Sequence, residues 1–150
     1  MRCVRRRPPQ LSRFQVLAVA ILVVLPALAG CDSRAREIRS RLSDPELLLF
    51  DRGQKLSSPC WACHDFYGSQ NKVGPSLSGL FGRRAGDGSF PGYSQAMRES
   101  GIVWDRQTLV RFLANPQAVV PGTTMVSPGL AGRDDLEALA FYTEQVTRAR

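Results

Sequence analysis

Two cysteines and a histidine stand close together near the middle of the chain, as Cys60, Cys63 and His64 in the stretch CWACH. Thiols and an imidazole at this spacing can form half of a zinc site, a redox-active dithiol or an attachment point for haem. Each possibility needs different partners elsewhere in the chain. The other cysteines, the methionines and the expected helices therefore decide between them.

The composition disfavours the zinc and dithiol interpretations. His64 is the only histidine, and of the two other cysteines Cys3 belongs to an N-terminal segment with the features of an export signal, while Cys31 directly follows that segment and is a presumed lipid site. A structural zinc site usually takes four Cys or His ligands, and only three are left. A thioredoxin-like dithiol needs alternating strands and helices, whereas the residues after the motif show helical patterns and no convincing strand.

A haem interpretation gives each of the three side chains a task. In C-x-x-C-H motifs the two thiols form thioethers with the haem vinyl groups, and the histidine ligates the iron. The spacing suits the macrocycle, because both vinyl positions and one axial position are reached from one short turn. Together with an export signal, the motif predicts one covalently attached haem c.

Residues 1–30 are expected to be that export signal. Five arginines precede an apolar run, Phe14–Ala29, in which Gln15 is the only polar residue. As a helix, residues 16–29 would rise only about 21 Å, short of a hydrocarbon core of about 30 Å, so a cleaved signal is favoured over an uncleaved anchor. The closing stretch LAGC resembles the bacterial lipobox, which implies that Cys31 is lipidated. The alternative is a chance cysteine at an ordinary cleavage site.

Removal of the signal changes the charge of the chain. The full sequence carries a formal net charge of +7, but 15 of its 20 basic residues remain after residue 30, against all 13 acids. Residues 31–45 form an Arg-rich tether, in which residues 32–43 carry a charge of +2, and residues 44–150 are close to neutral. The basic character therefore gives no support to nucleic-acid binding. The tether is either a solvated linker or a segment that contacts anionic lipid headgroups.

A six-coordinate haem iron needs a second axial ligand opposite His64. Because no second histidine exists, the candidates are Met97 and Met125. Met97 lies in a short segment with a helical pattern, where a methionine usually serves packing. Met125 lies in VVPGTTMVSPGL, where prolines and glycines predict a loop, and a loop can direct its thioether at a ligand. Met125 is therefore the predicted ligand.

Three further stretches resemble successive blocks of a class I cytochrome c of the mitochondrial branch: KVGPSLSGLFGRRAG (72–86), YSQAMRESGIVW (93–104) and FLANPQAVVPGTTM (112–125). The resemblance covers residues 46–147, with 148–150 as a tail, and implies an all-α class I cytochrome c fold around one haem. It also implies that the Pro75 carbonyl accepts a hydrogen bond from His64, and that four side chains bind around the haem propionates: Arg83, Tyr93, Trp104 and Thr123. Tyr93 and Trp104 could equally be core residues, and Arg83 a solvated loop charge.

The expected helices agree with this fold. Asp44 is the expected cap of a first helix, before Pro45 and Glu46, with apolar contacts from Leu47, Leu48 and Phe50. Asp105 is the expected cap of a second helix that ends at Asn115-Pro116. A third pattern has the 3–4 spacing of an amphipathic helix and consists of Leu136, Leu139, Ala140, Thr143 and Val146.

With both axial positions filled, the predicted role is one-electron transfer and not catalysis. The resemblance implies a carrier between a bc1-type complex and a terminal oxidase. The resemblance to a lipobox, with Asp32 directly after the cysteine as in enterobacterial lipoproteins kept in the inner membrane, implies a location on the periplasmic face of that membrane, held by the lipid. Two alternatives stay open: a haem subunit of a periplasmic dehydrogenase complex, or a haem-based sensor or enzyme if Met125 dissociates. Phe112 and Met97 replace a tyrosine and an asparagine of the mitochondrial relatives, which makes the ligand pocket more apolar.

Overall fold

The computed structural model describes residues 33–127, 129–130 and 132–148. The predicted export signal, residues 1–30, and the predicted lipid site Cys31 lie outside the described residues, as do residues 149–150. The chain divides into two compact units, Met1–Glu37 and Ile38–Arg150. The first contributes most of a short helix, α2 (Ser33–Arg39), within the segment predicted as the tether. The second holds all the other predicted site residues.

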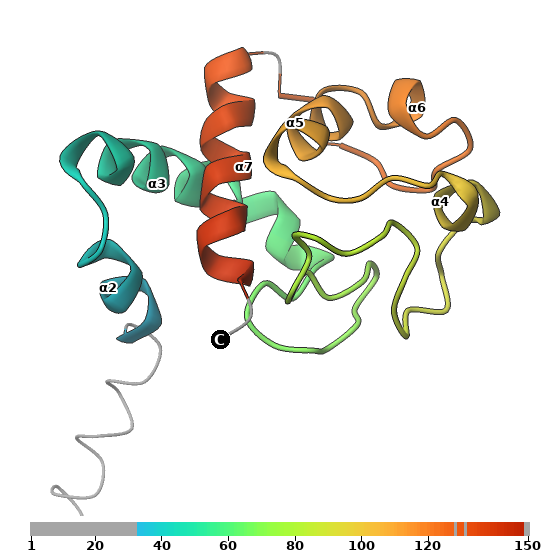
Figure 1. Ribbon diagram of the computed structural model, residues 1–150, viewed down its shortest axis with the longest axis horizontal. Helices are drawn as coiled ribbons and strands as arrows, with labels where there is room; N and C mark the ends of the chain where they lie inside the picture. The colour runs from blue at the N-terminus through green and yellow to red at the C-terminus, as the bar shows by residue number, and fades with distance from the viewer. Residues whose placement is uncertain (1–32, 128, 131, 149–150) are drawn as a thin grey trace, which may run out of the picture. The chain divides into compact units, whose positions relative to one another are not determined.

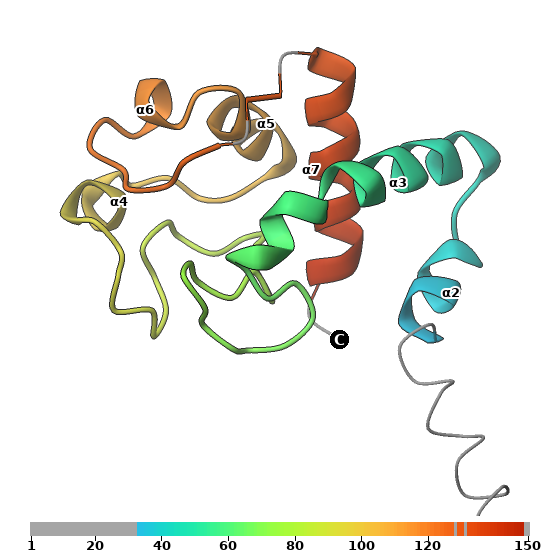
Figure 2. The same cartoon turned by 180° about the vertical axis from the view of Figure 1, so that it is seen from behind.

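Helices and loops make up the described part of Ile38–Arg150, as the sequence predicted (Figures 1 and 2). In chain order the elements are α3 (Asp44–Leu56), the 3-10 helix η2 (Ser58–Ala62), α4 (Gln95–Glu99), α5 (Arg106–Ala114), α6 (Pro116–Val119) and α7 (Arg133–Thr147). No strand occurs among the described residues, although Arg84 and Val103 form an isolated antiparallel bridge. No helix in this part of the chain is both long and apolar enough to cross a membrane.

The first predicted helix begins one residue earlier than expected. Ser43, and not Asp44, is the N-cap of α3, and its backbone N–H donates to Glu46 Oε2 at 2.9 Å. This reciprocal arrangement is a capping box, in which Glu46 satisfies a backbone donor at the start of the helix. Asp44 then lies in the first helical turn, where a carboxylate also interacts favourably with the helix dipole.

Helix α3 crosses α7 at a glycine. An added Cβ at Gly53 would overlap the Ala138 carbonyl and lie 2.5 Å from Tyr142 Cβ, so the two backbones approach closely only because Gly53 has no side chain. Phe50 is fully buried beside it and meets Tyr142 edge-on, with ring centroids 5.0 Å apart. The predicted contact from Leu48 is wrong, because Leu48 is 74% exposed on the outer side of α3.

The second predicted helix, α5, has the expected bounds. Asp105 caps it by accepting a hydrogen bond from the Thr108 N–H at 2.6 Å. It packs on α7, and Arg106 Nε donates to Glu144 Oε2 at 2.8 Å between the two helices. The predicted stop at Asn115-Pro116 also starts the short helix α6, whose N-cap is Asn115.

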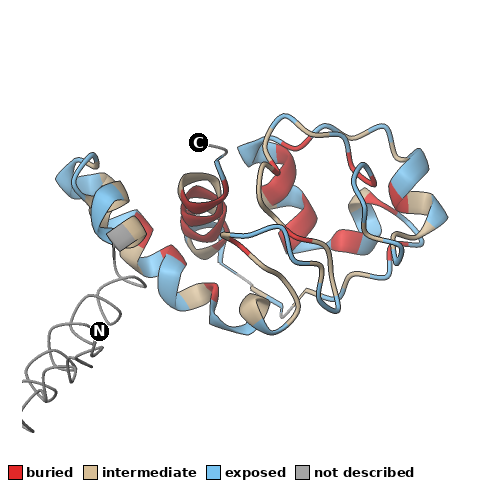
Figure 3. Ribbon diagram, turned by 90° about the horizontal axis from the view of Figure 1, so that it is seen from below, coloured by how far each residue is buried: buried red, intermediate tan, exposed pale blue. Residues whose placement is uncertain are grey.

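Helix α7 is the centre of the core, and Figure 3 shows how much of it is buried. All five residues of the predicted amphipathic pattern are buried: Leu136, Leu139, Ala140, Thr143 and Val146. The long loop between η2 and α4 is fastened to the end of this helix by the Gly79 N–H, which donates to the Thr147 carbonyl at 2.7 Å. The helices therefore leave one side of α7 to be closed by loops.

Candidate functional site

A cavity of about 300 Å³ lies within Ile38–Arg150, and it brings together every described residue for which a haem contact was predicted. These residues are Cys60, Cys63, His64, Pro75, Arg83, Tyr93, Trp104, Thr123 and Met125. Most of the rest of the lining is apolar and includes Leu77, Leu80, Leu109, Phe112, Leu113 and Leu139. A concave apolar cavity with a few convergent polar groups is typical of a cofactor site.

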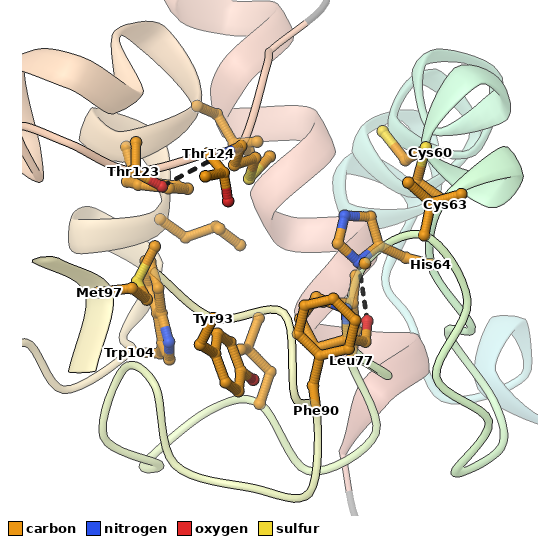
Figure 4. A pocket seen from close by; sticks show the side chains of 18 of the residues that line it. Cys60, Cys63, His64, Leu77, Phe90, Tyr93, Met97, Trp104, Thr123 and Thr124 are labelled. Atoms are coloured by element: carbon orange, nitrogen blue, oxygen red, sulfur yellow. Dashed lines mark hydrogen bonds between the residues drawn. The ribbon is translucent and has the colours of Figure 1, made fainter. Parts of the chain in front are cut away.

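One wall of the cavity carries both cysteines and the histidine (Figure 4). The turn of η2 places them together, because the Cys60 carbonyl accepts from the backbone N–H of Cys63 at 3.1 Å and of His64 at 2.9 Å. Both cysteines are free, with no disulfide between them. Burial raises the pKa of the Cys60 thiol. The wall therefore offers two thiols and one imidazole from five consecutive residues.

The His64 ring is held in one tautomer. Nδ1 lies 2.8 Å from the Pro75 carbonyl oxygen, which can only accept, so Nδ1 carries the proton and Nε2 keeps its lone pair. The ring packs against Gly74, where an added Cβ would lie 2.5 Å from His64 Cε1. Burial lowers the pKa of His64 and outweighs the opposing effect of the Pro75 bond. The result is a neutral, oriented imidazole, which is the form that binds a metal ion.

The opposite wall offers thioether sulfur. Met97 from α4 lies beside Trp104 on the side of the cavity away from His64 (Figure 4), and Met125 from the loop after α6 also lines the cavity. The Met125 N–H donates to Thr123 Oγ1 at 3.3 Å. The structure therefore brings both candidate methionines to the cavity, one on a helix and one on a loop.

A cation lies at the edge of the same cavity. The guanidinium of Arg83 donates to the carbonyls of Ser76 and Ser78, each at 3.2 Å, but its buried Nε has no hydrogen-bond partner. Such an orphaned donor is costly unless a ligand supplies an acceptor. Tyr93 lines the cavity too, and burial raises its pKa although Arg83 and Arg98 oppose that effect. This edge is suited to an acidic group.

Backbone pairing holds Arg83 and Trp104 in register. The Trp104 N–H donates to the Arg83 carbonyl at 3.0 Å, and the Gly82 N–H donates to the Trp104 carbonyl at 2.8 Å. Trp104 is buried and meets Phe112 of α5 edge-on, with ring centroids 5.1 Å apart. Two residues more than twenty positions apart in sequence are thereby fixed at one edge of the cavity.

Sequence reasoning missed two residues that hold the walls in place. Gln117 Nε2 donates to the Thr123 carbonyl at 2.6 Å, and its Oε1 accepts from the Gly122 N–H at 3.0 Å, so this one side chain fastens the loop that carries Met125. Lys72 Nζ donates to the carbonyls of Trp61 and His64, at 2.8 and 3.2 Å. The signal for Gln117 was its place directly after Asn115-Pro116, whereas nothing in the sequence distinguishes Lys72 from a solvated lysine.

The donor set fits a haem bound through the C-x-x-C-H motif. The cavity presents two thiols for the vinyl groups, an oriented imidazole for the iron, a thioether on the opposite wall and an unpartnered cationic donor for the acidic edge of the macrocycle. These features, on a helical fold, define a small haem c protein in which the cofactor completes the core.

Comparison with known proteins supports this class. Residues 50–147 match the model of the Cytochrome c family, and the chain belongs to that family. It is 45% identical over 83 residues to cytochrome c2 iso-2 of Magnetospirillum molischianum, which covers 55% of this chain and 86% of the relative. It is 42% identical over 96 residues to cytochrome c2 of Rhodoblastus acidophilus, covering 63% of this chain and 90% of the relative.

A solved structure agrees with the sequence relatives. Cytochrome cH from Methylobacterium extorquens superposes with a TM-score of 0.58 at 39% sequence identity, over 63% of this chain and 95% of that one. The predicted class I cytochrome c fold is thereby confirmed. The protein is an electron-transfer protein with a covalently bound haem c, and Cys60 and Cys63 fit the attachment motif.

Proposed function

We propose that the protein is a membrane-anchored, periplasm-facing carrier that passes single electrons from a bc1-type complex to a terminal oxidase. In this proposal His64 and Met125 would hold the haem iron. The observation that carries it is the His64–Pro75 hydrogen bond of 2.8 Å, which leaves Nε2 as the only ring nitrogen able to bind iron, facing a wall that holds thioether sulfur. A ligand on each side leaves no coordination position for a substrate.

The other site residues would hold the haem and set its environment. When bound, haem supplies reversible one-electron exchange between Fe(II) and Fe(III). Arg83, Tyr93, Trp104 and Thr123 are proposed to bind the propionates, whose charge would otherwise be costly in so apolar a cavity. The Pro75 carbonyl makes His64 a stronger ligand by accepting a hydrogen bond from its Nδ1–H.

The exposed rim of the cavity supports electron exchange with a partner protein at that rim. Val73 and Val126 both line the cavity and are 79% and 88% exposed. Residues 44–150 are close to neutral, so long-range electrostatic steering toward a partner would be weak. Confinement at the membrane would offset this, because a tethered carrier searches for its partner at a high effective concentration. A lipid on Cys31 would provide that confinement.

Replacing Cys31 with serine tests the anchored-carrier proposal. The variant is expected to move from the membrane to the soluble periplasmic fraction, with the haem content and absorbance spectrum of the wild type. Oxidase-dependent oxidation of the carrier should slow at least tenfold in intact cells, because the effective concentration is typically in the millimolar range for short linkers and would be lost. An unchanged rate, or a wild-type protein that is already soluble, would contradict the proposal.

Replacing Arg83 with leucine tests the proposed propionate contact. Loss of a half-buried cation beside an acidic group should lower the reduction potential by about 40 mV for one electron, which corresponds to on the order of 1 kcal/mol. Urea denaturation should also show that the free energy of unfolding of the leucine variant is about 1–3 kcal/mol lower than that of the wild type. The Arg83→Lys variant keeps the positive charge but lacks the planar guanidinium. Its reduction potential should therefore stay close to that of the wild type. Equal potentials in all three proteins would exclude Arg83 from the propionate site.

A further inference from the structure

The loop that carries Met125 follows α6 and has little buried surface of its own. Its first residues reach the core through Val120 and Thr123, which are 2% and 5% exposed. Thr124 and Val126, on either side of Met125, are both exposed. Because few apolar contacts hold such a segment, hydrogen bonds decide how firmly the loop keeps its side chains in place.

Gln117 of α6 fastens the first part of this loop. Its Oε1 accepts from the Gly122 N–H at 3.0 Å, and its Nε2 donates to the Thr123 carbonyl at 2.6 Å. The turn at Gly122 needs a glycine, because φ is +91° there and an added Cβ would lie 3.2 Å from the Ala96 Cβ of α4. The donor and the acceptor of the Gln117 amide are thus both engaged, and the loop cannot turn away from α6 without breaking two hydrogen bonds.

The fastened residues lead directly to Met125. Thr123 Oγ1 accepts from the Met125 N–H at 3.3 Å. Two residues after Met125, Ser127 Oγ donates to the Leu113 carbonyl at 2.7 Å, in the last turn of α5. Met125 therefore lies between a side-chain attachment to α6 and a side-chain attachment to α5. Loss of the first would free the residues that aim its thioether into the cavity.

We propose that Gln117 is a positioning residue that holds the Met125 thioether in the cavity and so keeps the coordination position opposite His64 closed. The inference rests on the proposed function, in which Met125 is a ligand. Gln117 is exposed and is not among the residues that line the cavity, so it acts through the loop. One neutral hydrogen bond commonly shifts an equilibrium about fivefold. Loss of both bonds should therefore raise the population of the displaced loop by on the order of tenfold.

Carbon monoxide binding by the reduced holoprotein measures this displacement, because the apparent affinity rises in proportion to the fraction of molecules in which Met125 has moved away. Gln117→Leu removes both bonds, and it should raise that affinity by roughly fivefold or more. The Gly122 amide hydrogen, followed by nuclear magnetic resonance, should exchange with solvent faster by a similar factor. Gln117→Glu keeps an acceptor for the Gly122 N–H but has no donor for the Thr123 carbonyl, so its affinity should rise by roughly twofold or more.

Gln107→Leu is the matched control, because Gln107 is an exposed glutamine of α5, and this variant should match the wild type in both measurements. An equal rise in carbon monoxide affinity in the Gln107 variant would overturn the proposal. So would Gly122 exchange that is unchanged in Gln117→Leu, or faster exchange without a gain in carbon monoxide affinity, which would mean that Gln117 only shapes the loop.

Failure of the proposed function would give a different result. A wild-type protein that binds carbon monoxide as readily as Met125→Ala would refute ligation by Met125, and with it both proposals. A wild-type protein that resists carbon monoxide, together with a Gln117→Leu variant that resists it equally, would refute the role of Gln117 alone.

Discussion

Met125→Ala is expected to lower the reduction potential by on the order of 0.2 V, within the span of about 0.8 V over which axial ligands set haem potentials. Thioether ligation favours the reduced iron, and alanine removes the sulfur that the loop after α6 presents to the cavity. The reduced variant should also bind carbon monoxide at neutral pH, because one coordination position is now open. Potentiometric titration and carbon monoxide difference spectra measure the two effects.

Met97→Leu is the matched control for this substitution. Met97 also lines the cavity and is 7% exposed, so leucine keeps its packing and removes only its sulfur. This variant should retain the spectrum of the wild type and shift the reduction potential by no more than a few tens of millivolts. For comparison, about 60 mV corresponds to a tenfold change in the equilibrium constant for one electron. A Met125 variant with an unchanged spectrum would refute the assignment. Ready carbon monoxide binding by the wild type would favour the sensor or enzyme alternative.

Gly53→Ala is expected to cost about 3 kcal/mol of the free energy of unfolding, the upper end of the usual range for overpacked contacts. A methyl group there would overlap the Ala138 carbonyl and lie 2.5 Å from Tyr142 Cβ, and a backbone carbonyl cannot turn aside as a flexible side chain can. The two helices must separate, which loosens the packing of Phe50 on Tyr142. Urea unfolding of the holoprotein, followed by circular dichroism, measures the loss.

Gln54→Ala, at the next position of α3, provides the comparison. Gln54 is exposed, so its replacement should change stability by no more than about 0.5 kcal/mol. In an unconstrained helix, replacing glycine with alanine stabilises the protein by up to about 1 kcal/mol. A lower free energy of unfolding for Gly53→Ala would therefore be due to the contact with α7. A stable Gly53→Ala protein would mean that the crossing of α3 and α7 can widen without cost.

Short-range patterns predicted much of the fold. The caps at Asp105 and before Pro45, and the 3–4 spacing from Leu136 to Val146, depend on residues within a few positions of each other. Such patterns located α3, α5 and α7, although α7 begins at Arg133, three residues before the first residue of its predicted pattern. The burial of Leu48 was predicted wrongly because the sequence shows which residues are apolar, but the approach of α7 at Gly53 decides which side of α3 is covered.

The sequence by itself determined the cofactor, because two thiols and an imidazole at fixed spacing match one macrocycle and no closed zinc site. It also restricted the second ligand to two methionines. Only the tertiary structure decided which side chains meet around the cavity: it gave His64 one tautomer through Pro75, placed Arg83 beside Trp104, and fastened the Met125 loop through Gln117. These contacts join residues distant in sequence or depend on side-chain direction, so they form only when the helices and loops have packed around α7.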